Sequence, residues 1–85
     1  METLRATEPL RTGDVVLIPV QLVRIEPTHG SAGICIRASV EPHAIVVDEG
    51  GGLRAFDPEG RPLALASLLE RVPDLSDAIA RSRRF

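Results

Sequence analysis

Aromatic residues are nearly missing from this 85-residue chain, which has no tryptophan, no tyrosine and only two phenylalanines, Phe56 and Phe85. Proteins that stack nucleic-acid bases or grip sugars generally do so on aromatic side chains. The composition therefore disfavours single-strand nucleic-acid readers and sugar-binding proteins. It also predicts a core built almost wholly from aliphatic side chains.

Lysine is absent as well, so all ten basic residues are arginines. Cys35 is the only cysteine, which excludes an internal disulfide framework and favours a reducing compartment. The N-terminus lacks a basic segment followed by an apolar one, and no apolar run reaches the roughly 18 residues that cross a bilayer. We expect a cytoplasmic protein with no membrane partner.

Charge is nearly balanced overall but unevenly distributed. Twelve acidic residues oppose the ten arginines, which gives a net charge of −2 with neutral histidines. Residues 13–60 hold seven acids and three arginines, whereas the chain from Arg61 onward holds five arginines and three acids. An acidic body with a basic C-terminal end is the main electrostatic feature of the sequence.

One apolar segment, residues 15–25, organises the rest of the chain. Its β-branched residues favour a strand, and apolar side chains occupy both even and odd positions. A strand with one solvated face alternates between polar and apolar residues, and this one does not. Both of its faces need cover, so we favour a homodimer. Pro19 cannot donate to a sheet ladder and predicts an edge or bulge that bends the strand, with residues 15–18 and 20–26 pairing with different neighbours.

Three more strands are predicted after this one. Residues 34–40 show the cleanest alternation in the chain, with Ile34, Ile36, Ala38 and Val40 on one side. Residues 44–48 and 53–56 form the other two, separated from their neighbours by turn composition at residues 27–33, 42–43, 49–52 and 57–60.

The apolar spacing becomes helical after residue 62. Leu65, Leu68, Leu69 and Val72 follow the i, i+3, i+4, i+7 pattern of one helix face, between Pro62 at the start and Pro73 at the end. Asp74 is a candidate N-cap for a second helix. Its inner face is Leu75, Ala78 and Ile79.

These elements predict one α+β domain. We expect a flexible N-terminal arm over residues 1–12 and a single domain over residues 13–85. Residues 13–62 would form a curved antiparallel sheet or a small open SH3-like barrel of about four to five strands, and residues 63–85 a helical hairpin. The Gly-Asp turn that leads into a long bent strand is similar to the start of many small SH3-like barrels.

Few side chains in the sequence can carry chemistry. Cys35, His29 and His43 would be needed for a thiol enzyme or a metal site, but their spacing lacks the close ligand pairs of a zinc site. The glycines at 50–52 follow two acids and precede a strand, which favours a hairpin loop over a phosphate cradle. We expect no catalytic residue, no metal and no cofactor, and therefore no enzyme.

Two charged groups of residues supply the functional hypotheses. The main one is a small non-catalytic protein-binding module, such as a phage- or plasmid-type inhibitor or accessory protein with an anti-CRISPR-like role. Its acidic turns would dock on a basic, nucleic-acid-handling partner through Glu41, Asp48, Glu49, Asp57 and Glu59. The alternative is a nucleic-acid-binding regulator that uses the C-terminal arginines Arg81, Arg83 and Arg84. Solubility of the acids and helix-end capping by the arginines are the non-functional interpretations.

Overall fold

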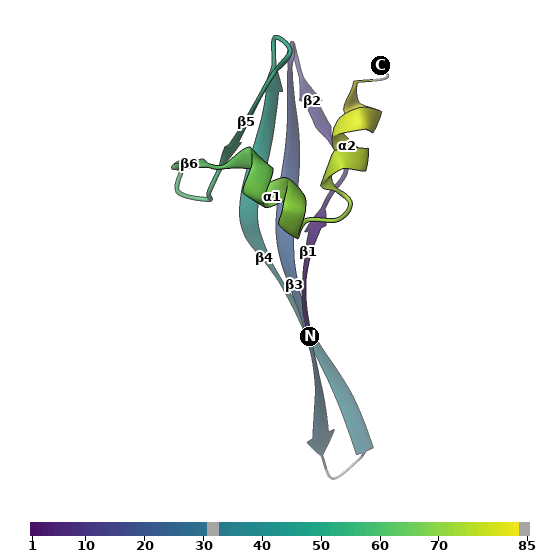
Figure 1. Cartoon of the computed structure of the whole chain (residues 1–85). Coiled ribbons are helices and arrows are strands. Elements are labelled where there is room, and N and C mark those ends of the chain that lie inside the picture. The colour runs from purple at the N-terminus through teal and green to yellow at the C-terminus, as the bar shows by residue number, and fades with distance from the viewer. Residues whose placement is uncertain (31–32, 84–85) are drawn as a thin grey trace.

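The computed structural model, which describes residues 1–30 and 33–83, shows one antiparallel sheet with both helices on the same face (Figure 1). Its elements are β1 (Glu2–Ala6), β2 (Leu10–Thr12), β3 (Val15–Gly30), β4 (Gly33–Glu49), β5 (Gly52–Phe56), β6 (Pro62–Leu63), α1 (Leu65–Arg71) and α2 (Leu75–Ser82). The predicted α+β class, a sheet followed by two C-terminal helices, is confirmed. The order β1-β3-β4-β5-β6 is an open path, and no pairing among the described residues closes it into a barrel.

The strands β3 and β4 are three times longer than their neighbours and pair along their whole length. The first half of β3 and the last half of β4 belong to the body of the domain. We call the remainder, residues 23–30 and 33–40, the arm. Strand β1 pairs with the arm only as far as Arg24, and beyond this residue the arm projects as a two-stranded ribbon (Figure 1). The arm gives the molecule its 55 Å long axis, against 26 and 21 Å for the other two.

Residues 1–12, for which the sequence predicted a flexible N-terminal segment, contain two strands. Residues 2–6 and 10–12 are strands, and both pair with the same edge of β3, β1 with Val20–Arg24 and β2 with Val15–Leu17. This matches the expectation that the two parts of the bent strand have different neighbours. The sequence hid β1 because only Leu4 and Ala6 of this strand pack against the core, and its other residues, Glu2, Thr3 and Arg5, are charged or polar.

Three boundaries also differ from the sequence-based prediction. Strand β3 continues through Pro27 to Gly30, because each strand of the arm needs only one partner and its outer edge tolerates proline. Pro42 and His43 do not interrupt β4 but lie at a register shift within it. Asp74 sits at the N-cap position of α2 without capping it, since its Oδ1 accepts from the Ala6 amide at 2.9 Å.

The predicted glycine loop is a tight hairpin turn. Gly50 and Gly51 join β4 to β5 with φ angles of 59° and 80°. Positive φ at both central residues is the requirement of a type I′ turn, which side chains with a Cβ meet poorly. The glycines are therefore explained by backbone geometry. In the next turn, the Gly60 amide donates to the Asp57 carbonyl at 2.9 Å, as the sequence predicted.

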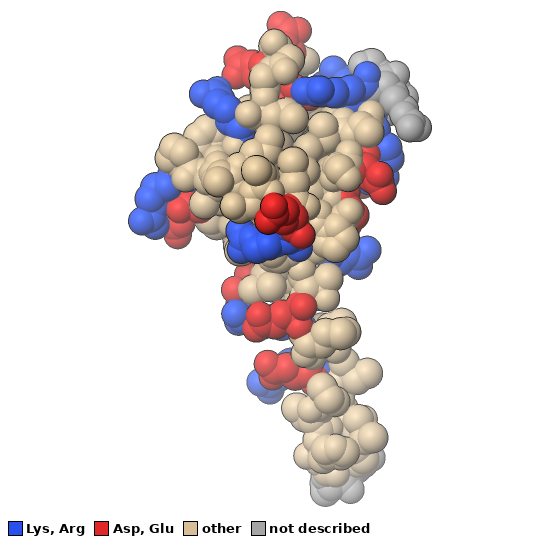
Figure 2. Space-filling view, viewed as in Figure 1, with Lys and Arg blue, Asp and Glu red and all other residues tan. Residues whose placement is uncertain are grey.

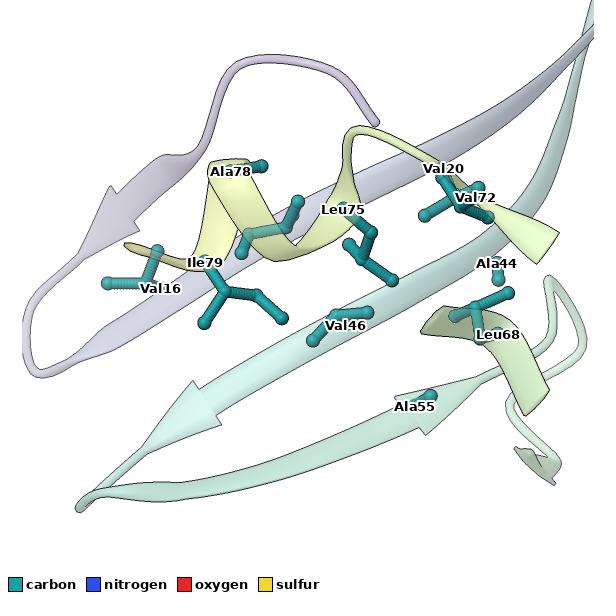
Figure 3. Close-up of a cluster of buried hydrophobic side chains, with 11 residues drawn as sticks. Val16, Val20, Ala44, Val46, Ala55, Leu68, Val72, Leu75, Ala78 and Ile79 are labelled. Carbon is teal, nitrogen blue, oxygen red and sulfur yellow. The ribbon is translucent and has the colours of Figure 1, made fainter. Parts of the chain in front are cut away.

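The core lies between the sheet and the two helices and is aliphatic, as predicted (Figure 3). Ile18, Val20 and Val46 contribute from the strands. The largest fully buried side chains of the helical layer are Leu68, Val72 and Leu75. Burying one such side chain completely is worth about 1.5–3 kcal/mol.

Only one face of β3 is covered by this core. Val16, Ile18 and Val20 point toward the helices and are at most 7% exposed. The odd-numbered residues Val15, Leu17 and Pro19 point to the other side of the sheet, where no described element packs. The second apolar face that the sequence predicted is therefore present and lacks cover from the same chain.

Candidate functional site

The residues with catalytic potential are not brought together. Cys35 and His29 both lie on the arm and are exposed. Cys35 lies opposite Thr28 and His29 lies opposite Ile34, and these two cross-strand pairs are successive, so the two side chains point to opposite faces of the ribbon. Among the described residues, no group of three or more His, Cys, Asp and Glu side chains could hold a metal ion.

The acids proposed for partner docking are each paired with an arginine. Asp48 is the most buried, with 8% exposure and an Oδ2 atom 3.0 Å from Arg83 Nε. Glu49 faces Arg54 at 3.5 Å, and the other pairs are Glu41 with Arg24 at 3.1 Å, Asp57 with Arg61 at 3.1 Å and Glu59 with Arg61 at 3.7 Å. Red and blue side chains are accordingly interspersed over the face shown in Figure 2. These acids lie in three separate places and are not merged into one acidic surface.

Two of the three C-terminal arginines have acidic partners. Arg81 Nη1 lies 3.7 Å from Glu8, and Arg83 binds Asp48 and reaches the Gly51 carbonyl at 3.5 Å. The hydrogen bond that Arg83 donates to Asp48, reinforced by the negative charge of that carboxylate, raises the pKa of Arg83. Arg84 lies outside the described residues. Arg83 thus serves to tie the end of α2 to the β4–β5 turn.

A hollow of about 400 Å³ lies beside this ion pair, lined by Arg11, Asp14, Asp48, Gly50, Gly51 and Arg83 among others. It joins the glycine turn to two arginines, as a phosphate site would. However, Arg11 donates to the Ser82 carbonyl at 3.1 Å, Arg83 donates to Asp48, and two carboxylates line the same space. An incoming anion would meet like charge, which argues against a phosphate site here.

The arm has one apolar face and one polar face. Residues that lie directly opposite each other in an antiparallel ribbon point to the same side. The apolar side is formed by the pairs Val23–Val40, Ile25–Ala38, Pro27–Ile36 and His29–Ile34. The polar side is formed by Arg24–Ser39, Glu26–Arg37 and Thr28–Cys35. Ile34 and Ile36 are 70% and 73% exposed, so this apolar side is open to solvent.

The apolar side of the arm continues the uncovered side of the body. Val20 pairs with Ala44 and Gln21 pairs with Pro42, which leaves His43 as the extra residue of a β-bulge. Because of the extra residue, the odd-numbered side chains of β4 after His43 lie on the same face as the even-numbered side chains before it. As a result, Val46 faces the helices, whereas Ile36 belongs by register to the opposite face of the ribbon, the face of Val15 and Leu17. The ribbon twists between the body and the arm, where β3 and β4 cross in Figure 1, so this face turns as it passes into the arm. We call this face of the ribbon, which starts on the side of the body away from the helices and continues by register along the arm, the open face. Its apolar members are Leu10, Val15, Leu17, Pro19, Val23, Ile25, Pro27, Ile34, Ile36, Ala38, Val40, Ile45, Val47 and Phe56.

An apolar hollow lies on the open face where the arm meets the body. It has a volume of about 540 Å³, and its lining includes Pro19, Pro42, Ile45, Phe56 and Pro58. The guanidinium carbon of Arg54 lies 5.6 Å from the centre of the Phe56 ring on the same face. Gln21 and Asp57 also line the hollow, as do Val20 and Ala44 at its inner end. The lining is mostly apolar, which suits apolar side chains of a partner.

Sequence reasoning found the alternation of residues 34–40 but not the projecting arm. The signal was present in the two-sided apolar pattern of residues 15–25, which required cover on both sides. Protein-family models, curated proteins and solved structures were compared with the chain, and none matched. None of the described helices is long and apolar enough to cross a membrane.

Proposed function

We propose that this chain is a small non-catalytic protein-binding module whose binding surface is the open face, including the apolar side of the arm. The observation that carries the proposal is the exposure of Ile34 and Ile36, at 70% and 73%, beside Ile25 and Val40 on a projecting ribbon. A contiguous apolar patch of this kind marks an interaction surface, because solubility alone would select polar residues on both sides of such a ribbon.

The apolar side of the arm would supply a large part of the binding energy of a specific complex. Complete burial of a valine or isoleucine contributes about 1.5–3 kcal/mol. Four such side chains, Ile25, Ile34, Ile36 and Val40, would together offset much of the loss of translational and rotational freedom on association. The adjoining body residues would supply the remainder.

The distribution of charge gives weaker support to a binding role than the exposed apolar area does. Docking of the acidic turns on a basic partner, as in a phage- or plasmid-type inhibitor, remains a narrower form of the same function. The arginine beside each acid reduces the net charge that such a partner would meet. The same pairing reduces the support for a nucleic-acid-binding role of Arg81 and Arg83.

Photo-crosslinking in the host cell tests the proposal. A photoreactive amino acid replaces Ile36 on the apolar side of the arm or, as the control, Arg37 on the polar side. We expect protein adducts from position 36 and many fewer from position 37. Equal yields from both positions, or adducts with nucleic acid alone, would contradict the proposal.

A further inference from the structure

We propose that the partner of the open face is a second copy of this chain, packed face to face with the arms running in opposite directions. This inference rests on the proposed function, since it names the partner of the same surface. Each arm would lie on the body of the other copy. The helices of both copies would remain on the outside of the assembly.

The surface area of the single chain supports this partner. Its accessible surface is 5906 Å². A compact monomer of 9.2 kDa exposes about 4,900 Å². The excess of about 1,000 Å² is close to the roughly 800 Å² that one subunit buries in a standard interface. The radius of gyration, 15.5 Å, likewise exceeds the value of about 12 Å expected for a compact chain of this length.

The open face is also complementary to itself. In a two-fold dimer the same patch meets its own copy, so a strongly charged patch would repel itself. Glu49 and Arg54 lie on this face and pair with each other at 3.5 Å. Arg5, which lies opposite Gln21, is a further charge on this face, and the apolar contacts around it would have to offset its repulsion from its own copy. The remaining positions of β3 and β4 on this face are almost all apolar. Because the ribbon twists between the body and the arm (Figure 1), two such faces would wrap around each other, with the sheets about 10 Å apart where they meet.

The lengths of the arm and the body indicate where the two-fold axis lies. Residues 15–22 of β3 belong to the body and residues 23–30 to the arm, so each part is eight residues long. At about 3.3 Å per residue, each spans roughly 26 Å. An axis at the junction lays each arm along the body strands of the other copy and covers Ile34 and Ile36. An axis at the middle of the arm would leave the body uncovered.

A membrane surface fits the open face less well than a second copy does. Interfacial binding to anionic lipids requires basic residues around the apolar patch. The charged residues of the arm are Arg24, Glu26 and Arg37, and Arg24 is bound to Glu2 and Glu41. The arm therefore offers little net positive charge to a lipid headgroup.

Sedimentation velocity of the purified chain over a wide concentration range tests this inference. Ile36→Glu places a charge on the open face, and Ser39→Glu places the same charge on the polar side of the same arm. Neither residue contributes to the core, so circular dichroism should show the same fold for all three proteins. We expect a species of twice the chain mass for the natural sequence, dimerisation weakened at least tenfold by Ile36→Glu, and a change of less than threefold for Ser39→Glu.

Several results would overturn the inference. A chain that stays monomeric throughout the range would remove the second copy as the partner. So would a dimer that tolerates Ile36→Glu, because it would use another surface. Monomeric protein whose position 36 still crosslinks to another protein would leave the proposed function standing. Monomeric protein without position-dependent crosslinks would remove both. Ile36-dependent binding to phosphatidylcholine–phosphatidylglycerol vesicles in place of dimerisation would assign the face to a membrane.

Discussion

The Nε atom of Arg83 lies 3.0 Å from Oδ2 of Asp48, which joins the end of α2 to the end of β4. Asp48 is 8% exposed and has a buried apolar residue, Val46, two positions before it. A carboxylate in this position depends on its partner, because burial penalises an unpaired charge. The residues that the sequence assigned to two different binding functions thus form one structural contact.

Removal of this contact should lower stability through both residues. We expect Arg83→Ala and Asp48→Ala each to lower the midpoint of urea unfolding, with the double variant lowering it by less than the two single effects combined. Arg81→Ala is the control, because both side chains of the Arg81–Glu8 pair are exposed and the pair should contribute little to stability. If the effects of the two substitutions add up in the double variant, Asp48 and Arg83 do not stabilise the fold through each other.

The contribution of Arg83 to the stability of the fold should not depend on pH near neutrality. The pKa of Arg83 is raised in the folded chain, so its contribution to stability is complete below the ordinary arginine pKa. The contribution would be lost only as strongly alkaline pH passes the raised value. The stability gap between the natural chain and Arg83→Ala should therefore be constant from pH 6 to pH 9. A gap that narrows toward pH 9 would contradict this assignment.

The Asp74 side chain should hold the N-terminal strand to the helices. Its Oδ1 accepts from the Ala6 amide at 2.9 Å, so Asp74→Ala leaves that amide without a partner. We expect a loss of about 1–2 kcal/mol and faster hydrogen exchange at Ala6. Asp74→Asn keeps an acceptor oxygen and should lose less. Unchanged exchange at Ala6 in Asp74→Ala would show that β1 is held by its strand pairing alone.

The aliphatic core gives the largest expected loss of stability. Leu68 is fully buried, and Leu68→Ala should lower the free energy of unfolding by about 2–5 kcal/mol. Leu69 on the same helix is 36% exposed, and Leu69→Ala should cost much less. Circular dichroism is the suitable probe, because the chain has no tryptophan or tyrosine. Protein concentration must be held constant if the chain dimerises. Similar losses of stability for Leu68→Ala and Leu69→Ala would show that α1 packs on the sheet in a different orientation.

The free protein should retain no nucleic acid at low salt. Arg81 and Arg83 have acidic partners at 3.7 and 3.0 Å, so each would have to give up an ion pair to contact a phosphate. Retention of DNA or RNA that disappears when Arg81, Arg83 and Arg84 are all changed to Ala would instead favour the nucleic-acid-binding alternative. A filter-binding assay at low and moderate salt distinguishes the two results.

The sequence predicted those elements whose signal is local. The helical spacing of Leu65, Leu68, Leu69 and Val72 placed α1, although Leu69 proved partly exposed. Turn composition at the glycines of 50–52 placed the β4–β5 hairpin. Strand β1 escaped prediction because its stability comes from pairing with β3, about 20 residues away, and from only two small contacts with the core.

The candidate site could not be placed from the sequence because it depends on one residue. Apolar residues at 34–40 and at 44–47 both occupy β4, and the bulge at His43 decides that they face opposite ways. A bulge depends on pairing with the partner strand, so neither composition nor periodicity reveals it. The Asp48–Arg83 pair was equally hidden, since 35 residues separate its members.

The distance between two spin labels on Cys35 tests the central claim most directly. Cys35 is the only cysteine, is exposed, and points to the polar side of the arm, so a nitroxide there leaves the open face intact. It pairs with Thr28, between five and six residues from the proposed axis. With strands rising about 3.3 Å per residue and sheets about 10 Å apart, the two labels should lie roughly 40 Å from each other. Pulsed dipolar spectroscopy should give this distance for the natural chain and no defined distance for Ile36→Glu. A distance below about 20 Å, as for arms paired side by side, or no dipolar coupling at any concentration, would contradict the account.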